Sequence, residues 1–262
     1  MSDFLAAMAK SSAERAANAG AFTDADFDKP VVPLNPGAFG VIAEIKQRSP
    51  AEGNLSDSKI GASHLISRAE SYAAGGAAAI SVLTEPSRFD GELAHLEQAA
   101  AAVPGTPAMR KDFLVDPVQV LEARKAGASG VLLITTMLDD ATLKAMLDCA
   151  WEHNMFVLLE SFDEDDLLRS ARFIDDRGKL LIGVNTRNLR TLEVDPNRLQ
   201  NLAASLPDAV CVAESGLHAP DDAARVAGWG YSMALVGTAL MRSDDPTTLI
   251  ADMTAAGAAA CS

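Results

Sequence analysis

The chain has 262 residues, 48% hydrophobic and 22% charged, so it can build a folded core and is not a disordered chain. It carries 22 Lys and Arg against 36 Asp and Glu, a net charge of -14, with only 5% aromatic residues, which argues against a nucleic-acid partner. Three dispersed cysteines predict neither a disulfide framework nor a zinc site and fit a reducing cytoplasm. No leader-like start and no apolar run of ~18 residues is seen, so we expect a cytoplasmic protein with no membrane partner.

Residues 1–39 are predicted to form a helix (about 2–19) followed by a Pro-rich linker. From residue 40 onward, short apolar runs alternate with longer amphipathic runs. The eight candidate strands are 40–46, 78–83, 107–110, 130–134, 155–160, 180–185, 209–214 and 232–237. These runs are apolar throughout, which is typical of strands covered on both faces. The clearest helices between them are 116–126, 139–153 and 220–227, the first opened by an N-cap Asp and a Pro.

Alternation of strands and helices predicts parallel strands joined by right-handed crossovers. Eight such units in about 220 residues favour an α/β fold, a (β/α)₈ TIM barrel with an N-terminal helical extension. A doubly wound open sheet is the alternative, but residues 44–50 (EIKQRSP) are not the glycine-rich loop expected after its first strand. We find no internal boundary and expect a single domain over 1–262, with the barrel in 40–262.

Charged side chains gather at the predicted carboxyl ends of the strands, where the active sites of such barrels lie. The charged and amide residues at these ends are Glu44, Lys46, Arg48, Arg110, Lys111, Asp112, Glu160, Asn185, Arg187 and Glu214. A single charge there often marks only where the chain meets solvent. Glu44, however, lies inside an apolar run and shares one side of its strand with Lys46, and an ionisable group in that position is costly unless paired. Carboxylates and lysines converging on one mouth predict a catalytic site.

The last two strands are each followed by glycine and a hydroxyl, in Ser215-Gly216 and Gly237-Thr238. Glycine lets backbone N–H groups approach a ligand closely, and these two loops commonly bind phosphate in this fold. One glycine alone would indicate only a turn, but two such adjacent loops favour a phosphate site. A cationic mouth in an acidic protein predicts a small-molecule substrate with more than one negative charge.

Several motifs, in one order along the chain, resemble the indole-3-glycerol phosphate synthase family. They are 42–50 (IAEIKQRSP), 81–91 (SVLTEPSRFDG), 110–115 (RKDFLV), 158–160 (LLE), 183–192 (GVNTRNLRTL), 212–216 (VAESG) and 236–242 (VGTALMR). The resemblance implies a carboxy-lyase of tryptophan biosynthesis. Its members cyclise 1-(2-carboxyphenylamino)-1-deoxyribulose 5-phosphate to indole-3-glycerol phosphate with loss of CO₂ and water, and use no metal and no organic cofactor.

The resemblance also assigns roles to the catalytic candidates. Lys111 is the general acid of ring closure, and Glu160 is the base that removes the proton in dehydration. Lys46 pairs with the substrate carboxylate and is a second candidate acid for dehydration, so the division of work between the two lysines stays open. Glu44 orients Lys46 and holds a sugar hydroxyl. Asn185 and Glu214 position the intermediate.

The remaining candidates are expected to bind substrate. The phosphate contacts are Ser49, Ser215, Gly216, Gly237 and Thr238. The apolar walls are Phe89, Phe113, Leu133 and Leu189, although both phenylalanines could equally be barrel packing. The cations are Arg48, Arg110 and Arg187. An isomerase acting on a related phosphoribosyl amine, or a catalytically silent pathway partner, are the alternative functions, and we expect a monomer or weak oligomer.

Overall fold

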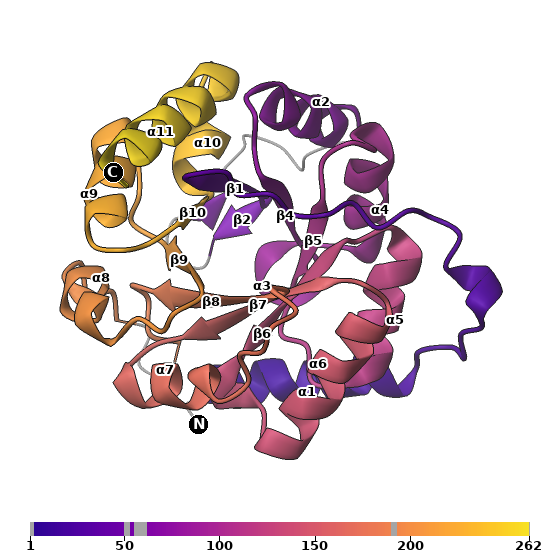
Figure 1. Cartoon of the computed structure of the whole chain (residues 1–262). Coiled ribbons are helices and arrows are strands. Elements are labelled where there is room, and N and C mark those ends of the chain that lie inside the picture. Colours follow the sequence, from indigo (N-terminus) through magenta and orange to yellow (C-terminus); the bar gives the residue numbers. More distant parts are fainter. Residues whose placement is uncertain (1–2, 50–52, 55–61, 190–192, 262) are drawn as a thin grey trace.

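The computed structural model describes residues 3–49, 53–54, 62–189 and 193–261. Eight parallel strands close into a barrel in the order β1-β10-β9-β8-β7-β6-β5-β4 (Figure 1). Their bounds are β1 Gly40–Ile45, β4 Ala79–Leu83, β5 Ala108–Lys111, β6 Gly130–Ile134, β7 Phe156–Ser161, β8 Leu180–Asn185, β9 Val210–Glu214 and β10 Met233–Val236. The predicted (β/α)₈ barrel is therefore confirmed, and each predicted strand is present within two residues of its expected bounds.

Helices surround the barrel and follow the predicted pattern. Their bounds are α1 Asp3–Ala17, α2 Ala62–Ala74, α3 Pro86–Phe89, α4 Leu93–Ala102, α5 Pro117–Ala126, α6 Asp140–Glu152, α7 Glu164–Ala171, α8 Arg198–Asn201, α9 Pro220–Gly228, α10 Thr238–Arg242 and α11 Pro246–Ala260. The Asp116 carboxylate accepts a hydrogen bond from Val118 N, so Asp116 caps α5 as the sequence predicted. Across the described ranges, no helix combines the length and apolar character that a membrane span requires.

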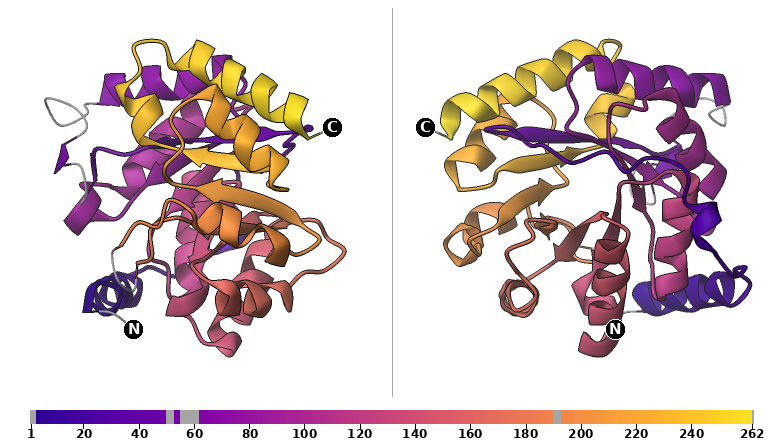
Figure 2. Two further views of the ribbon diagram at one scale, coloured as in Figure 1. Left: turned by 90° about the vertical axis from the view of Figure 1, so that its left-hand side faces the viewer. Right: turned by 45° about the vertical axis from the view of Figure 1, so that its right-hand side comes forward.

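The apolar character of the strands follows from burial on both faces. Every residue of β1, β4, β6, β7 and β8 is buried, because side chains fill the barrel on one side and helices cover the other. Parallel pairing of β1 with both β4 and β10 closes the sheet. Outside it, α11 lies along α9 and α2, as both views of Figure 2 show.

Two loops carry short elements that the sequence did not predict. After β1 the chain forms a two-stranded hairpin, β2 (Arg48–Ser49) with β3 (Gly53–Asn54), and after β4 it forms the four-residue helix α3. These segments are too short to show a hydrophobic period. The third predicted strand is displaced by one residue, so that Lys111 is its last residue rather than the first of the following loop.

Candidate active site

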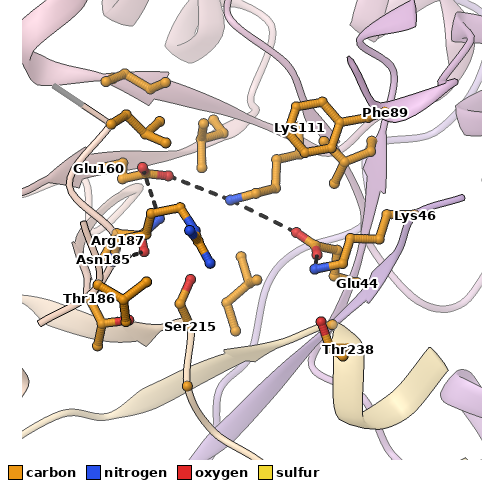
Figure 3. Close-up of a pocket in the computed structure, with 18 of the residues that line it drawn as sticks. Glu44, Lys46, Phe89, Lys111, Glu160, Asn185, Thr186, Arg187, Ser215 and Thr238 are labelled. Carbon is orange, nitrogen blue, oxygen red and sulfur yellow. Dashed lines mark hydrogen bonds and ion pairs between the residues drawn. The ribbon is translucent and has the colours of Figure 1, made fainter. Parts of the chain in front are cut away.

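A pocket of about 550 Å³ opens at the carboxyl ends of the strands (Figure 3). The predicted site residues that line it are Glu44, Lys46, Phe89, Lys111, Phe113, Glu160, Asn185, Arg187, Leu189, Ser215, Gly216, Gly237 and Thr238. They come from strands and loops distributed around the barrel. Glu44 and Thr238, which are 194 positions apart in the chain, therefore line the same pocket. The pocket lies where active sites of this fold are found.

Lys111 reaches into the middle of this pocket from the end of β5 (Figure 3). Its Nζ lies 3.1 Å from Glu214 Oε2, 3.5 Å from Glu160 Oε2 and 4.0 Å from Glu44 Oε2. Burial alone would lower the pKa of Lys111, but the three nearby carboxylates outweigh burial and raise it above its ordinary value. Lys111 therefore holds its proton throughout the neutral range and can serve as a proton donor.

Glu214 lies beneath the pocket, fully buried at the end of β9. Burial, together with Glu160 and Glu44, raises its pKa to about 8, against the opposing pull of Lys111. Its Oε1 has no hydrogen-bond partner and lies against Gly183, where a Cβ atom would overlap it. A glycine in the middle of β8 thus leaves room for the Glu214 carboxyl group beside Lys111.

Glu44 and Lys46 form a second charged pair on the side of β1 that faces the pocket. Lys46 Nζ lies 2.7 Å from Glu44 Oε1. Burial raises the pKa of Glu44, but the charges of Lys46 and Lys111 outweigh burial and leave the pKa below its ordinary value. A Cβ atom on Gly237 would overlap Glu44 Oε1, so that glycine also makes room for the pair. The expected common face of Glu44 and Lys46 is confirmed.

Asn185 and Arg187 extend the site at the end of β8. Asn185 Nδ2 donates to Glu160 Oε1 over 3.1 Å, and Asn185 Oδ1 accepts from Arg187 N over 2.9 Å. These bonds fix the amide orientation and leave Glu160 Oε2 near Lys111. The Arg187 guanidinium lines the pocket and forms no ion pair with any residue that the structure describes. It is therefore a cation available to an incoming anion.

The loops after β9 and β10, which the sequence predicts to bind phosphate, both line the pocket. Ser215 and Gly216 have φ angles of +69° and +75°, in the left-handed region that favours glycine. Gly237 and Thr238 stand where β10 turns into α10, and both residues line the pocket. Both loops line the same cavity, at neighbouring strands of the barrel.

One wall of the pocket is aromatic. The Phe113 ring centroid lies 6.2 Å from that of Phe89 and 5.8 Å from that of Phe4, in an edge-on contact. Phe4 belongs to α1, so the N-terminal helix contributes to the pocket. The sequence did not predict this contact, because no local signal shows which face of α1 meets the barrel.

Three of the predicted binding residues lie elsewhere. Arg110 points away from the pocket and contacts Gln119 O, Glu122 and Asp112, because alternate residues of β5 face opposite sides and Lys111 takes the inner one. By the same alternation Leu132 and Ile134, not Leu133, line the pocket. Arg48 donates to Ser87 O and Arg88 O and pairs with Asp90, so it docks on α3. The side chain of Ser49 and the end of the 183–192 motif lie outside the described residues.

Other pocket residues were missed. They are Phe4, Leu83, Leu132, Ile134, Thr186, Val194, Leu217, His218 and Leu235. Asp112 was predicted at its strand end but was given no role in the site. Ile134 is the partner of Glu160 across β6 and β7, and Leu132 lies two residues before Ile134. The alternation of a strand therefore places both side chains on the same face of the barrel as Glu160. His218, which follows the seventh predicted strand, also lines the pocket, although the sequence motifs assign it no role.

The fold and the pocket define a (β/α)₈-barrel protein with lysines and carboxylates clustered at the carboxyl end of the strands. The sequence model of the family "Indole-3-glycerol phosphate synthase" matches residues 7–253. Relatives named indole-3-glycerol phosphate synthase include one from Nocardioides sp., 46% identical over 88% of this chain and 86% of its own. Another, from Mycobacterium leprae, is 41% identical over 91% of this chain and 85% of its own. The chain belongs to the indole-3-glycerol phosphate synthase family.

Comparison with solved structures supports the fold alone. The 3-hexulose-6-phosphate synthase from Salmonella typhimurium matches with a TM-score of 0.63 at 15% identity, over 85% of this chain and all of that one. At that identity, the likeness is one of architecture and says nothing of the reaction.

Proposed function

We propose that this chain is an indole-3-glycerol phosphate synthase. It converts 1-(2-carboxyphenylamino)-1-deoxyribulose 5-phosphate to indole-3-glycerol phosphate, with release of CO₂ and water. The observation that carries this proposal is the position of Lys111 among Glu44, Glu160 and Glu214, in a pocket with two glycine-containing loops and an aromatic wall. Family membership over most of the chain supports it.

Ring closure requires a proton at the ketone oxygen of the substrate. The ring carbon that carries the carboxylate attacks the ketone carbon, and the electron pair of the carbonyl bond takes a proton from Lys111 Nζ. The carboxylate then leaves as CO₂, and the electrons of the broken bond restore the aromatic ring. Lys111 suits this role because it is protonated and reaches into the pocket.

Dehydration requires an acid and a base on the same intermediate. The new hydroxyl leaves as water with a proton from an acid, and a base removes a proton so that the five-membered ring gains its double bond. Glu160 is the proposed base, oriented by Asn185. Lys46 or Lys111 is the acid, because both ammonium groups face the pocket.

Binding of the substrate falls to the other lining residues. Arg187 and Lys46 offer positive charge to the carboxylate, and Ser215, Gly216, Gly237 and Thr238 surround the phosphate. Phe89, Phe113 and Leu189 contact the aromatic ring. Arg110 and Leu133 take no direct part, because neither lines the pocket.

The setting of the reaction is part of the same proposal. We place the enzyme in the cytoplasm, because its dispersed cysteines fit a reducing compartment. We expect a monomer or weak oligomer that acts on a small anionic molecule and has no nucleic-acid partner.

Turnover of the carboxyphenylamino deoxyribulose phosphate, in buffer with a chelator, tests the proposal through the fluorescence of the indole product. We expect wild-type turnover and a loss of at least about 100-fold in kcat for Lys111→Met with substrate binding retained, because general acid catalysis contributes about 10²–10⁴-fold. Lys144→Met on exposed α6 is the matched control and should turn over normally.

Full turnover by Lys111→Met would remove Lys111 from the chemistry. No product from the wild type, with binding of the substrate still detectable, would overturn the proposal in favour of an isomerase or a silent partner.

A further inference from the structure

Asp112 directly follows Lys111 and lines the same pocket, yet its carboxylate is fully engaged by the protein. Arg15 of α1 forms a bidentate ion pair with it, in which Nη2 donates to Oδ1 and Nη1 donates to Oδ2, both over 2.8 Å. Oδ1 also accepts from Phe113 N, and Oδ2 accepts from Thr84 Oγ1 and Arg110 Nη2. The Asp112 side chain has no exposed surface.

These bonds exclude Asp112 from proton transfer. Burial opposes ionisation, but the hydrogen bonds from Arg15 and the charge of Arg110 hold the pKa of Asp112 below its ordinary value. A carboxylate that stays ionised and accepts five hydrogen bonds has no free site for a substrate proton.

The same carboxylate fixes the backbone on both sides of itself. Its bond to Phe113 N holds the residue that forms the aromatic wall. Its bond from Thr84 reaches the end of β4, where Thr84 N donates to the carbonyl oxygen of Lys111. The Asp112 carboxylate therefore fixes the backbone at the end of β5, where Lys111 precedes it and Phe113 follows it.

The inner face of α1 contacts this region at several points. Phe4, Met8, Ser12 and Arg15 recur at helical spacing and so share one face of the helix. Phe4 contacts the Phe113 ring, and Ser12 Oγ accepts from Gln119 Nε2 of α5 over 2.9 Å. The charged contact among them is the ion pair of Arg15 with Asp112, the residue that follows Lys111.

We propose that Arg15 is a positioning residue of the active site. Its bidentate ion pair with Asp112 connects α1 to the end of β5 and so fixes the positions of Lys111 and Phe113. The inference rests on the proposed function for its kinetic consequence and on the Asp112 contacts for its structural one. Arg110 has a supporting part, since it bonds both Asp112 and Thr84 from the outer side of β5.

Arg15→Met tests the proposal, with Lys10→Gln as the control that removes a positive charge from the exposed face of the same helix. We expect kcat/KM of Arg15→Met to fall about tenfold to hundredfold, with lower kcat and higher KM, because small misplacements of reacting groups are costly. A variant that merely left less protein folded would lower kcat and leave KM unchanged. Arg15→Lys keeps the charge without the fork and should fall between wild type and Arg15→Met.

Added guanidinium at millimolar concentration should restore part of the activity of an Arg15→Ala variant and none of the activity of Lys111→Met. Kinetics of Arg15→Met equal to those of Lys10→Gln would overturn the proposal, as would a lower kcat at unchanged KM.

Amide hydrogen exchange separates this inference from the proposed function, because it needs no turnover. The amides of Phe113 and Thr84 should exchange faster in Arg15→Met than in Lys10→Gln, while those of β7 and β8 keep their protection. A wild type without turnover would end the proposed function and leave this measurement to decide the structural claim. Unchanged exchange at both amides would overturn the claim even if turnover were normal.

Discussion

Complete burial and an unpartnered oxygen distinguish Glu214 from the carboxylates around it. Glu214 is fully buried, with Oε1 unpartnered and Oε2 facing Lys111, whereas Glu44 has two lysines near it. Burial and the like charges of Glu160 and Glu44 raise the pKa of Glu214 to about 8. Between its ordinary pKa and about 8, folded Glu214 therefore binds more protons than unfolded Glu214 does.

This raised pKa makes the stability of the protein fall as pH rises. Unfolded Glu214 loses its proton near its ordinary pKa of 4.5, and folded Glu214 keeps it to about 8. Between these values the folded state binds more protons, so its free energy of unfolding decreases by up to ~1.4 kcal/mol per pH unit for this one group. Glu214→Gln cannot titrate and should lack this component. Urea unfolding at pH 5, 6, 7 and 8 measures the difference between the two proteins.

Subtraction of the two stability curves cancels the other titrating groups, provided that they behave alike in both proteins. Glu14→Gln on the exposed side of α1 controls for the replacement of any glutamate and should run parallel to the wild type. If the Glu214→Gln curve is also parallel to the wild type between pH 5 and 8, Glu214 is ionised in the folded protein and its proton has no part in the site.

At the scale of single residues, the sequence does not show which strand residues point into the barrel and which point outward. Lys111 and Arg110 are neighbouring cations at one strand end, and only the alternation of the strand separates them. In a strand that is buried on both faces, the apolar pattern does not say which face is the inner one. The sequence predicted a common face for Glu44 and Lys46 because they are two positions apart. Arg110 and Leu133, by contrast, were predicted to bind substrate but point away from the pocket.

Helix α3 shows how a four-residue element can hold a functional side chain. It ends at Phe89, in the pocket wall, and Glu85 is its N-cap. The buried Glu85 carboxylate accepts from Ser87 N over 2.8 Å and from Arg88 N over 2.7 Å. A helix this short has little stability of its own, so its N-cap and its docking contacts determine its position. Glu85 also accepts from Ser87 Oγ.

Glu85→Ala should release α3 and widen the pocket at Phe89. The expected result is a severalfold rise in KM with a smaller change in kcat, because Phe89 is proposed to contact the aromatic ring of the substrate and not the reacting atoms. Two N–H groups lose their acceptor, which should reduce the free energy of unfolding by about 1–2 kcal/mol. Steady-state kinetics and urea unfolding measure the two effects.

Asp139→Ala provides the matched control for that prediction. Asp139 caps α6 by accepting from Thr142 N, and neither residue lines the pocket. This variant should lose stability without a change in KM. A KM that rises equally in both variants would show that the effect of Glu85→Ala comes from general destabilisation.

Long elements were predictable from the sequence, and short ones were not. Strands β6 and β8 match their predicted bounds, because buried apolar runs with clear flanking loops leave few alternatives. The hairpin β2–β3 and helix α3 occupy two to four residues each and depend on tertiary contacts such as those of Arg48 with Ser87 and Arg88. Their sequence contains no period that could reveal them.

At the scale of the whole molecule, closure of the barrel joins its first strand to its last. Strand β1 pairs with β10, and α11, the last helix, packs against β1 as well as α9 and α2. The contact is tight at Gly257, where a Cβ atom would overlap the ring of Phe39, which is itself buried just before β1. The count of eight strands predicted closure, but no pattern in the sequence pairs Gly257 with Phe39.

Gly257→Ala should therefore destabilise the protein although alanine favours helices. The added methyl group overlaps the buried ring of Phe39, which would have to shift, and overpacking of this kind costs about 1–3 kcal/mol. Gly228→Ala, at the exposed end of α9 with open space around it, should instead stabilise by about 0.5–1 kcal/mol. Urea unfolding of both variants gives the two free energies. Neither Gly228 nor any residue of α11 lines the pocket, so KM should stay unchanged in both variants. If Gly257→Ala were as stable as Gly228→Ala, the Phe39 ring would be free to shift and the α11 contact would not hold β1 in place.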